Sequence, residues 1–209
     1  MPTRHPSVYL YDRVADADDF EALYALEALT NDRVRDETGI VQLVAPEDRV
    51  FGPGSGPIMA AFTHVNPTGS RFSEGVYGMF YAARERATAV AETAHHHARF
   101  LAATKEGPMH LPMRLYHVAI DARLHDLRDA AAVSPAVFDP DDYTSARALG
   151  AALHARGSSG VVYRSVRRST GFCVGLFKPR GAKSCLQVAV LLYAWNGERF
   201  TDIFEKVEE

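Results

Sequence analysis

The sequence predicts an α+β domain in which strands outnumber helices and many strands are antiparallel. Runs of five to nine β-branched and aromatic residues recur through its second half, as is typical of strands. Residues 84–104 are rich in Ala, Glu and Arg, which favour a helix. The dipeptide Asn196-Gly197 separates two strand-like runs and is a strong hairpin signal. We expect residues 1–209 to form a single domain, as the length allows.

The individual elements follow from local patterns. Residues 7–14 alternate as a strand does, and apolar spacing predicts a helix over 18–35. Residues 36–57 hold three prolines and four glycines, which predict a long insertion or loop, either a lid or a mobile segment. Residues 57–65 fit a helix or a strand. The remaining expectations are a helix ending near Ala155, capped by residues 139–142, and strands at 76–83, 113–120, 160–166, 171–177, 187–195 and 199–207.

Composition narrows the classes of partner. The net charge of −3 argues against direct nucleic-acid binding, which needs a basic surface. No apolar run approaches the roughly 20 residues needed to span a bilayer, and no signal peptide is evident, so we expect a cytoplasmic protein that does not bind membranes. Cys173 and Cys185 fall in strands expected to be neighbours. Two thiols in such a chain are expected to be free and reduced.

The most informative segment is a predicted strand followed by a helix. Arg71, Tyr81 and Glu92 are spaced by ten and eleven residues across this corner. Strand ends and helix starts present side chains and free amides to one crevice. A guanidinium, a phenol and a carboxylate there suit a nucleotide. Taken singly, each residue also fits an ordinary role: a surface arginine, a core aromatic and a helix-face carboxylate.

Two other groups of polar residues allow both a functional and an ordinary structural interpretation. Ser165, with the basic residues Arg164, Arg167 and Arg168, fits a grip on phosphate and equally a solvated hairpin. The run 95–97 consists of three histidines, but consecutive helical residues point about 100° apart, so we expect a solvated helix face and no metal site. A nucleophile elbow, a Walker A sequence and C-x-x-C spacing are absent from the sequence.

In sequence the chain resembles the RES-domain family, named for its arginine, glutamate and serine, whose members are toxins of bacterial toxin–antitoxin pairs. The resemblance covers residues 7–14 and 66–195, although Cys173 stands where many relatives carry asparagine and residues 15–60 exceed the smallest members. The matching motifs are Tyr11-Asp12-Arg13-Val14, Gly69-Ser70-Arg71-Phe72, Phe80-Tyr81-Ala82, Ala89-Val90-Ala91-Glu92, Tyr163-Arg164-Ser165-Val166-Arg167, Gly171 and Leu176-Phe177-Lys178-Pro179.

This resemblance implies an ADP-ribosyltransferase-like fold, with a split, mostly antiparallel sheet and flanking helices. It also implies cleavage of the bond between nicotinamide and ribose in NAD, by hydrolysis or phosphorolysis, which depletes cellular NAD. The catalytic candidates by resemblance are Arg71, Tyr81 and Glu92. The residues expected to bind NAD are Arg13, Phe72, Ser165 and Arg167.

The expected ligands and partners follow from the same resemblance. NAD is the substrate rather than a cofactor, phosphate is a potential co-substrate, and we expect no cofactor and no metal. A helix-turn-helix antitoxin is expected to cover the active site and to form a hetero-oligomer with the chain. Two alternatives stay open: a mono-ADP-ribosyltransferase that modifies a cellular protein, and a non-catalytic module that binds a partner.

Overall fold

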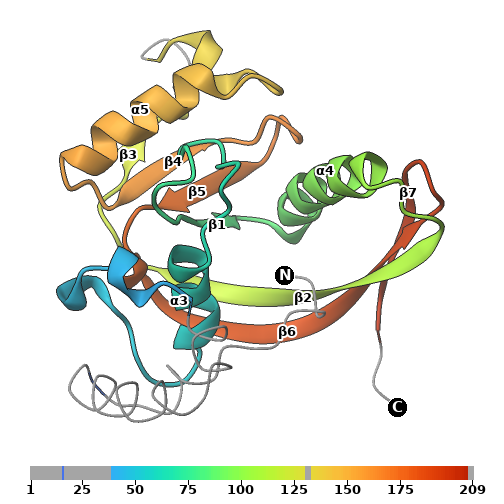
Figure 1. Cartoon of the computed structure of the whole chain (residues 1–209), viewed down its shortest axis with the longest axis horizontal. Coiled ribbons are helices and arrows are strands. Elements are labelled where there is room, and N and C mark those ends of the chain that lie inside the picture. Colours follow the sequence, from blue (N-terminus) through green and yellow to red (C-terminus); the bar gives the residue numbers. More distant parts are fainter. Residues whose placement is uncertain (1–15, 17–38, 130–132, 207–209) are drawn as a thin grey trace.

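Two sheets and three α-helices make up the described part of the chain, which comprises residue 16 and residues 39–129 and 133–206 of a computed structural model (Figure 1). Most strand pairs are antiparallel, which confirms the predicted α+β class. The predicted strand at 7–14, with Arg13, and the helix at 18–35 lie outside the described residues. None of the described helices is long and apolar enough to cross a membrane.

The first sheet has four strands and carries one side of the functional site. Its central strand β5 is antiparallel to both neighbours, and only the short strand β3 pairs in parallel. In spatial order the strands are β1 (Phe80–Ala83), β5 (Phe172–Leu176), β4 (Gly160–Arg164) and β3 (His125–Asp126). The motif residues on β1 and after β4 are therefore only two strands apart.

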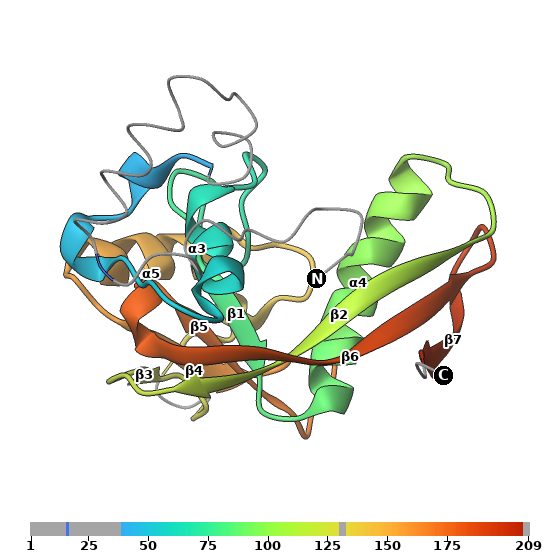
Figure 2. The same ribbon diagram turned by 90° about the horizontal axis from the view of Figure 1, so that it is seen from below.

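The second sheet is a long antiparallel ribbon of β2 (Met109–Ile120), β6 (Ala182–Trp195) and β7 (Phe200–Glu205). It curves beneath α4, as Figures 1 and 2 show from two directions. The strands β6 and β7 meet at the predicted turn, where Gly197 has φ +101°, a conformation that glycine adopts without steric cost. This pairing confirms the hairpin predicted from Asn196-Gly197.

Each helix buries its apolar face against a different part of the sheets. The helix α3 (Ser55–Thr63) settles the ambiguity at 57–65 and packs against both sheets, where its residues meet Leu176 of β5 and Cys185 of β6. The helix α4 (Arg86–Ala103) packs on the second sheet, with Val90 and Ala94 against a cluster centred on Leu191 and Tyr193.

The helix α5 (Thr144–Ala155) covers the first sheet, and its Ala146 is fully buried with Val161 of β4. At Gly150 the helix approaches the backbone of Phe72 so closely that a Cβ atom would lie 2.1 Å from the Phe72 carbonyl oxygen. Only glycine fits at such a contact. The helix α5 therefore packs directly on the backbone of the Gly69–Phe72 motif and fixes its position.

Segment 36–57, where described, contains short regular turns and buried residues. It contains two 3₁₀ turns, η2 (Val41–Leu43) and η3 (Pro46–Asp48), and its Val41 and Val44 are buried in the core around α3. Asp48 forms ion pairs with Arg180, at 2.8 Å, and with Lys178, at 3.4 Å. Burial and ion pairs fix this segment to the two sheets, because its apolar residues complete a core.

One local prediction requires correction, and another is confirmed in part. Cys173 and Cys185 lie on β5 and β6, which belong to different sheets, so their strands are not neighbours; both thiols are free, as predicted. The N-cap position of α5 is Tyr143, whose side chain makes no capping hydrogen bond, but Asp142 accepts from the amide of Thr144, the first residue of the helix, at 2.9 Å. Asp139 accepts from two amides of the preceding turn, because an aspartate two or three residues upstream closes such turns readily.

Candidate functional site

A cavity of about 910 Å³ opens between α4, the segment that follows α3, and the start of α5. Its walls include Arg71, Tyr81 and Glu92, so the three predicted catalytic residues share one space. A second cavity of about 780 Å³ between β1 and β2 includes Tyr81 but neither of the other two. We call the larger one the site cavity. Described residues 39–57 do not line it, so they provide no lid there.

Arg71 is almost buried, at 7% exposure, and is held on one side only. Its Nη1 donates to the carbonyl of Asp139 at 2.8 Å and to that of Val137 at 3.3 Å, while its guanidinium lies 4.4 Å above the ring of Tyr143. Within the described residues, Nε and Nη2 make no hydrogen bond. These two donors form the fork that matches a carboxylate or a phosphate.

Tyr81 comes from β1, and its hydroxyl is bound to the motif loop. The hydroxyl accepts from the amide of Phe72 at 3.1 Å and lies 2.9 Å from Ser70 Oγ. Burial of the hydroxyl raises the pKa of Tyr81 to about 12, although both hydrogen bonds act in the opposite direction. The phenol is therefore neutral, and the residue, which is 36% exposed, lines the site cavity.

Glu92 lies in the second turn of α4, and a partner that directly follows β4 fixes its position. The hydroxyl of Ser165 donates to its Oε1 at 2.6 Å, and Cys173 Sγ lies 3.8 Å from the same oxygen. Burial and, secondly, the charge of Glu92 raise the pKa of Cys173 to about 12, so the thiol stays protonated beside the carboxylate. One oxygen of Glu92 is thus committed to the protein.

Backbone amides of the following turn hold the Ser165 hydroxyl in place. Its Oγ accepts from the amides of Arg167 at 3.1 Å and Arg168 at 3.0 Å, and the residue is 4% exposed. With one donated and two accepted hydrogen bonds, the hydroxyl has no capacity left for a ligand. The structure therefore places Ser165 behind Glu92 and not on the cavity wall.

The other predicted NAD-binding residues also lie away from the wall. Phe72 is fully buried, and its ring meets the edge of Tyr163 at 5.1 Å between centroids. Arg167 donates to the carbonyl of Pro140 and lies outside the site cavity. Both residues shape the loops around the cavity through packing and backbone contacts. Arg13 lies outside the described residues.

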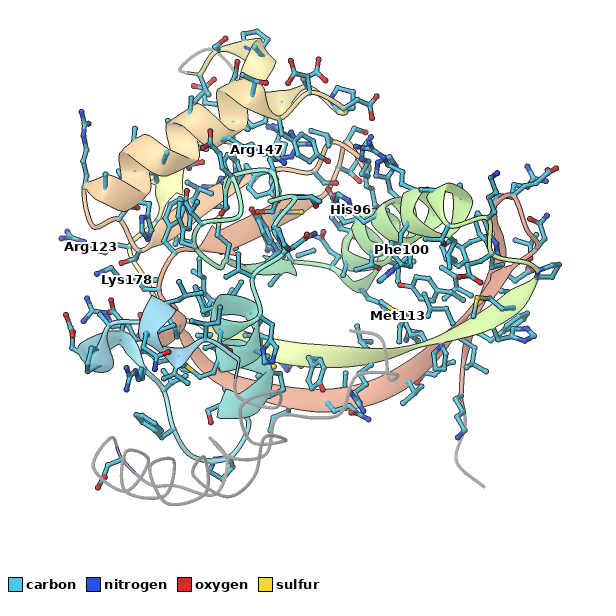
Figure 3. The ribbon with its side chains drawn as sticks, in the orientation of Figure 1. His96, Phe100, Met113, Arg123, Arg147 and Lys178 are labelled. Atoms are coloured by element: carbon cyan, nitrogen blue, oxygen red, sulfur yellow. The ribbon has the colours of Figure 1, made fainter. Side chains whose placement is uncertain are left out.

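The sequence did not predict all of the residues that line the site cavity. His96, Arg99 and Phe100 of α4 line the site cavity, and so does Arg147 of α5, which donates to the carbonyls of Ser70 at 3.0 Å and Thr68 at 2.8 Å. Figure 3 labels His96, Phe100 and Arg147. Helical spacing from Glu92 gave a usable signal for His96 and Phe100, at four and eight residues. Nothing in the sequence pointed to Arg147.

No group of three or more His, Cys, Asp or Glu side chains is arranged to hold a metal ion within the residues that the structure describes. His95 and His96 are neighbours on α4, with ring centroids 5.4 Å apart. Burial is the largest cause that lowers the pKa of both rings, and nearby arginines act in the same direction. Neutral imidazoles are therefore expected near pH 7.

Comparison with known proteins identifies the family to which these motifs belong. A family model described as "RES domain" matches residues 46–196, which is most of the chain. The chain belongs to the RES-domain family. The RES domain is found in toxin–antitoxin systems, and the family supports a toxin-like, NAD-related role. The predicted resemblance is therefore confirmed.

A similar protein matches nearly the whole of this RES-domain chain. It is the "Uncharacterized protein y4oC" of Sinorhizobium fredii (strain NBRC 101917 / NGR234), which is 29% identical over 206 residues. The match covers 98% of this chain and 84% of the relative. The likeness therefore includes the residues before position 46, which the family model does not match.

Proposed function

We propose that this RES-domain protein is an enzyme that cleaves the bond between nicotinamide and ribose in NAD. The observation that carries the proposal is the convergence of Arg71, Tyr81 and Glu92 on one cavity, with Glu92 fixed by Ser165 at 2.6 Å. Membership of a family with an NAD-related role supports NAD as the ligand. The cavity, of about 910 Å³, is within the size range of small-molecule and cofactor sites.

The contacts suggest a role for each residue. Arg71 offers Nε and Nη2 to the pyrophosphate, while its Nη1 stays on the loop carbonyls. The ring of Tyr81 provides a wall for the nicotinamide. The second carboxylate oxygen of Glu92 faces the ribose, where it stabilises the positive charge that develops at C1′ as the bond to nicotinamide breaks. The electron pair of that bond neutralises the pyridinium, so nicotinamide leaves uncharged.

The direct test is release of nicotinamide from NAD by the purified protein, followed by chromatography. Glu92→Gln removes the charge and keeps the shape, and we expect a loss of about a hundredfold or more in kcat, the scale typical of a lost electrostatic stabiliser. Glu106→Gln is the matched control, because Glu106 lies beyond the end of α4 and does not line the site cavity. Full activity of Glu92→Gln would reject the role of Glu92.

The products distinguish the alternatives. Phosphorolysis yields ADP-ribose 1″-phosphate only when phosphate is present, and hydrolysis yields ADP-ribose. With NAD labelled in the adenylate, a label that stays on a protein would instead identify a mono-ADP-ribosyltransferase. No release and no transfer would leave a non-catalytic module as the function.

We further propose that the enzyme is the toxin of a toxin–antitoxin pair and acts in the cytoplasm, where it reaches the cellular NAD pool. The family is associated with such pairs, which supports an antitoxin partner in general. We propose a helix-turn-helix antitoxin that covers the site cavity and forms a hetero-oligomer. Expression of the chain alone should lower cellular NAD and stop growth, whereas Glu92→Gln should be tolerated. Equal toxicity of both forms would refute the link between toxicity and NAD cleavage.

A further inference from the structure

Glu92 and His96 stand one above the other on the wall of the site cavity. They are four residues apart on α4, a spacing that places Cβ atoms about 5–6 Å apart on one helix face. More than a third of His96 is exposed, and the residue lines the site cavity. Within the described residues the ring contacts His95 but makes no hydrogen bond. Both ring nitrogens are therefore open to a ligand.

The charges around His96 favour its neutral form. Desolvation is the largest cause that lowers its pKa, His95 and two arginines lower it further, and Glu92 opposes them. Charged and ionisable groups surround His96 on several sides. Glu92, His95 and Arg99 belong to α4 itself. The others are Arg71 of the Gly69–Phe72 motif, Arg167 after β4, and Asp141, Asp142 and Arg147 at and before the start of α5. A neutral imidazole is a proton acceptor at neutral pH.

Glu92 is poorly placed to serve as that acceptor. Its Oε1 already accepts the Ser165 proton at 2.6 Å, and its charge is needed beside the ribose. A carboxylate that stabilises an oxocarbenium-like state loses that function once it is protonated. Attack by water therefore calls for a second group close to C1′. Among the ionisable side chains on the wall, His96 is one helical turn from Glu92 and uncommitted.

We propose that His96 is a further catalytic residue of this chain, the general base that activates water for hydrolysis of NAD. The inference rests on the proposed function. The bond between C1′ and the nicotinamide nitrogen breaks, and its electron pair stays with nicotinamide. The water oxygen bonds to C1′, and its proton passes to the unprotonated ring nitrogen of His96 and then to solvent. The products are nicotinamide, ADP-ribose and one proton.

Phosphate as the acceptor separates this role from simple binding. Near pH 7.5 inorganic phosphate is largely the dianion, which already presents a nucleophilic oxygen and needs no base. A residue that only binds NAD would affect both acceptors equally. A residue that deprotonates water would affect only the reaction without phosphate. The ratio of the two rates therefore reports the role of His96.

The experiment measures nicotinamide release by the wild type, His96→Gln and His97→Gln, with and without inorganic phosphate, between pH 5.5 and 8.5. His97 is the matched control, because it lies one residue further along α4 and does not line the site cavity. In His96→Gln we expect the rate without phosphate to fall about a hundredfold, the scale of a lost general base. The rate with phosphate should stay within about threefold. Wild-type hydrolysis should fall on the acid side once His96 is protonated, at a lower pH than for an ordinary histidine because its pKa is lowered, and this loss should disappear in the variant.

Other outcomes overturn the inference. Equal losses with both acceptors would make His96 a binding or structural residue, and no loss would remove it from the mechanism. A wild type that releases nicotinamide only with phosphate would show that water is not activated. If the wild type releases none under either condition, the proposed function fails as well. Thermal melting of each variant shows whether a loss reflects unfolding.

Discussion

Removal of the Ser165 hydroxyl tests whether this residue positions Glu92 or touches the ligand. Ser165→Ala deletes a hydrogen bond of 2.6 Å to a carboxylate and leaves the amides of Arg167 and Arg168 without their acceptor. A hydrogen bond to a charged group contributes about 1.5–3 kcal/mol, and each buried amide left unpaired costs about 1 kcal/mol or more. We therefore expect a loss of about 3.5–5 kcal/mol in the free energy of unfolding. For a chain of this size, that lowers the Tm by roughly 7–20 °C.

The kinetic effect distinguishes the two roles. A carboxylate that has lost its fixed orientation should lower kcat about 10- to 100-fold, equivalent to about 1.4–2.8 kcal/mol in the barrier. KM for NAD should change by less than about twofold, since the hydroxyl has no free capacity to bind the ligand. Nicotinamide release at several NAD concentrations, measured well below the lowered Tm, gives both constants.

The matched control is Ser158→Ala. Ser158 Oγ also accepts a backbone amide, that of Gly160 at 3.2 Å, but it has no carboxylate partner. The control should lose some stability and keep kcat. A Ser165→Ala variant with a raised KM and an unchanged kcat would refute the positioning role and restore Ser165 as a residue that contacts the ligand.

Two further substitutions test the loop that carries Arg71. Gly150→Ala should destabilise the protein by several kcal/mol in urea titrations, because its Cβ would lie 2.1 Å from the Phe72 carbonyl, whereas helix propensity alone predicts a gain of about 1 kcal/mol. Gly107→Ala, with open space around it, is the control, and a stabilised Gly150→Ala would contradict the contact. Tyr81→Phe should lower the free energy of unfolding by about 1–3 kcal/mol, because the Phe72 amide loses its acceptor. Its KM for NAD should rise less than that of Tyr81→Ala, which also removes the ring. Equal KM values for the two variants would exclude the ring from NAD binding.

The sequence predicted those parts of the fold and site that depend on local patterns. The Ala-rich run around Glu92 favours a helix in any context, and Asn196-Gly197 needs a turn whatever surrounds it. Tyr81 and Glu92 were correctly placed on a strand and on the helix that follows, because only two residues separate β1 from α4. Such short connections leave few arrangements in space.

The remaining features depend on contacts between distant segments. Ser165 meets Glu92 across 73 positions, and Arg71 reaches the Asp139 carbonyl across 68. Phe72 looked like a ligand residue because it follows Arg71 in the motif, yet neighbouring side chains in an irregular loop point in different directions and α5 covers this one. Helical spacing put His96 on the face of Glu92. It could not show that the start of α5 stands opposite and makes that face a cavity wall.

Three arginines in and around the site donate hydrogen bonds to backbone carbonyls of nearby loops. Arg71 and Arg167 donate to carbonyls of segment 137–140, and Arg147 donates to carbonyls of Thr68 and Ser70. Thr68 and Ser70 line the site cavity, and so do Asp141 and Asp142, which directly follow segment 137–140. Binding of an anion by Arg71 therefore acts on a group that also fixes a loop. Substitutions of these arginines should lower NAD affinity and loop stability together, so a raised KM alone does not identify a phosphate contact.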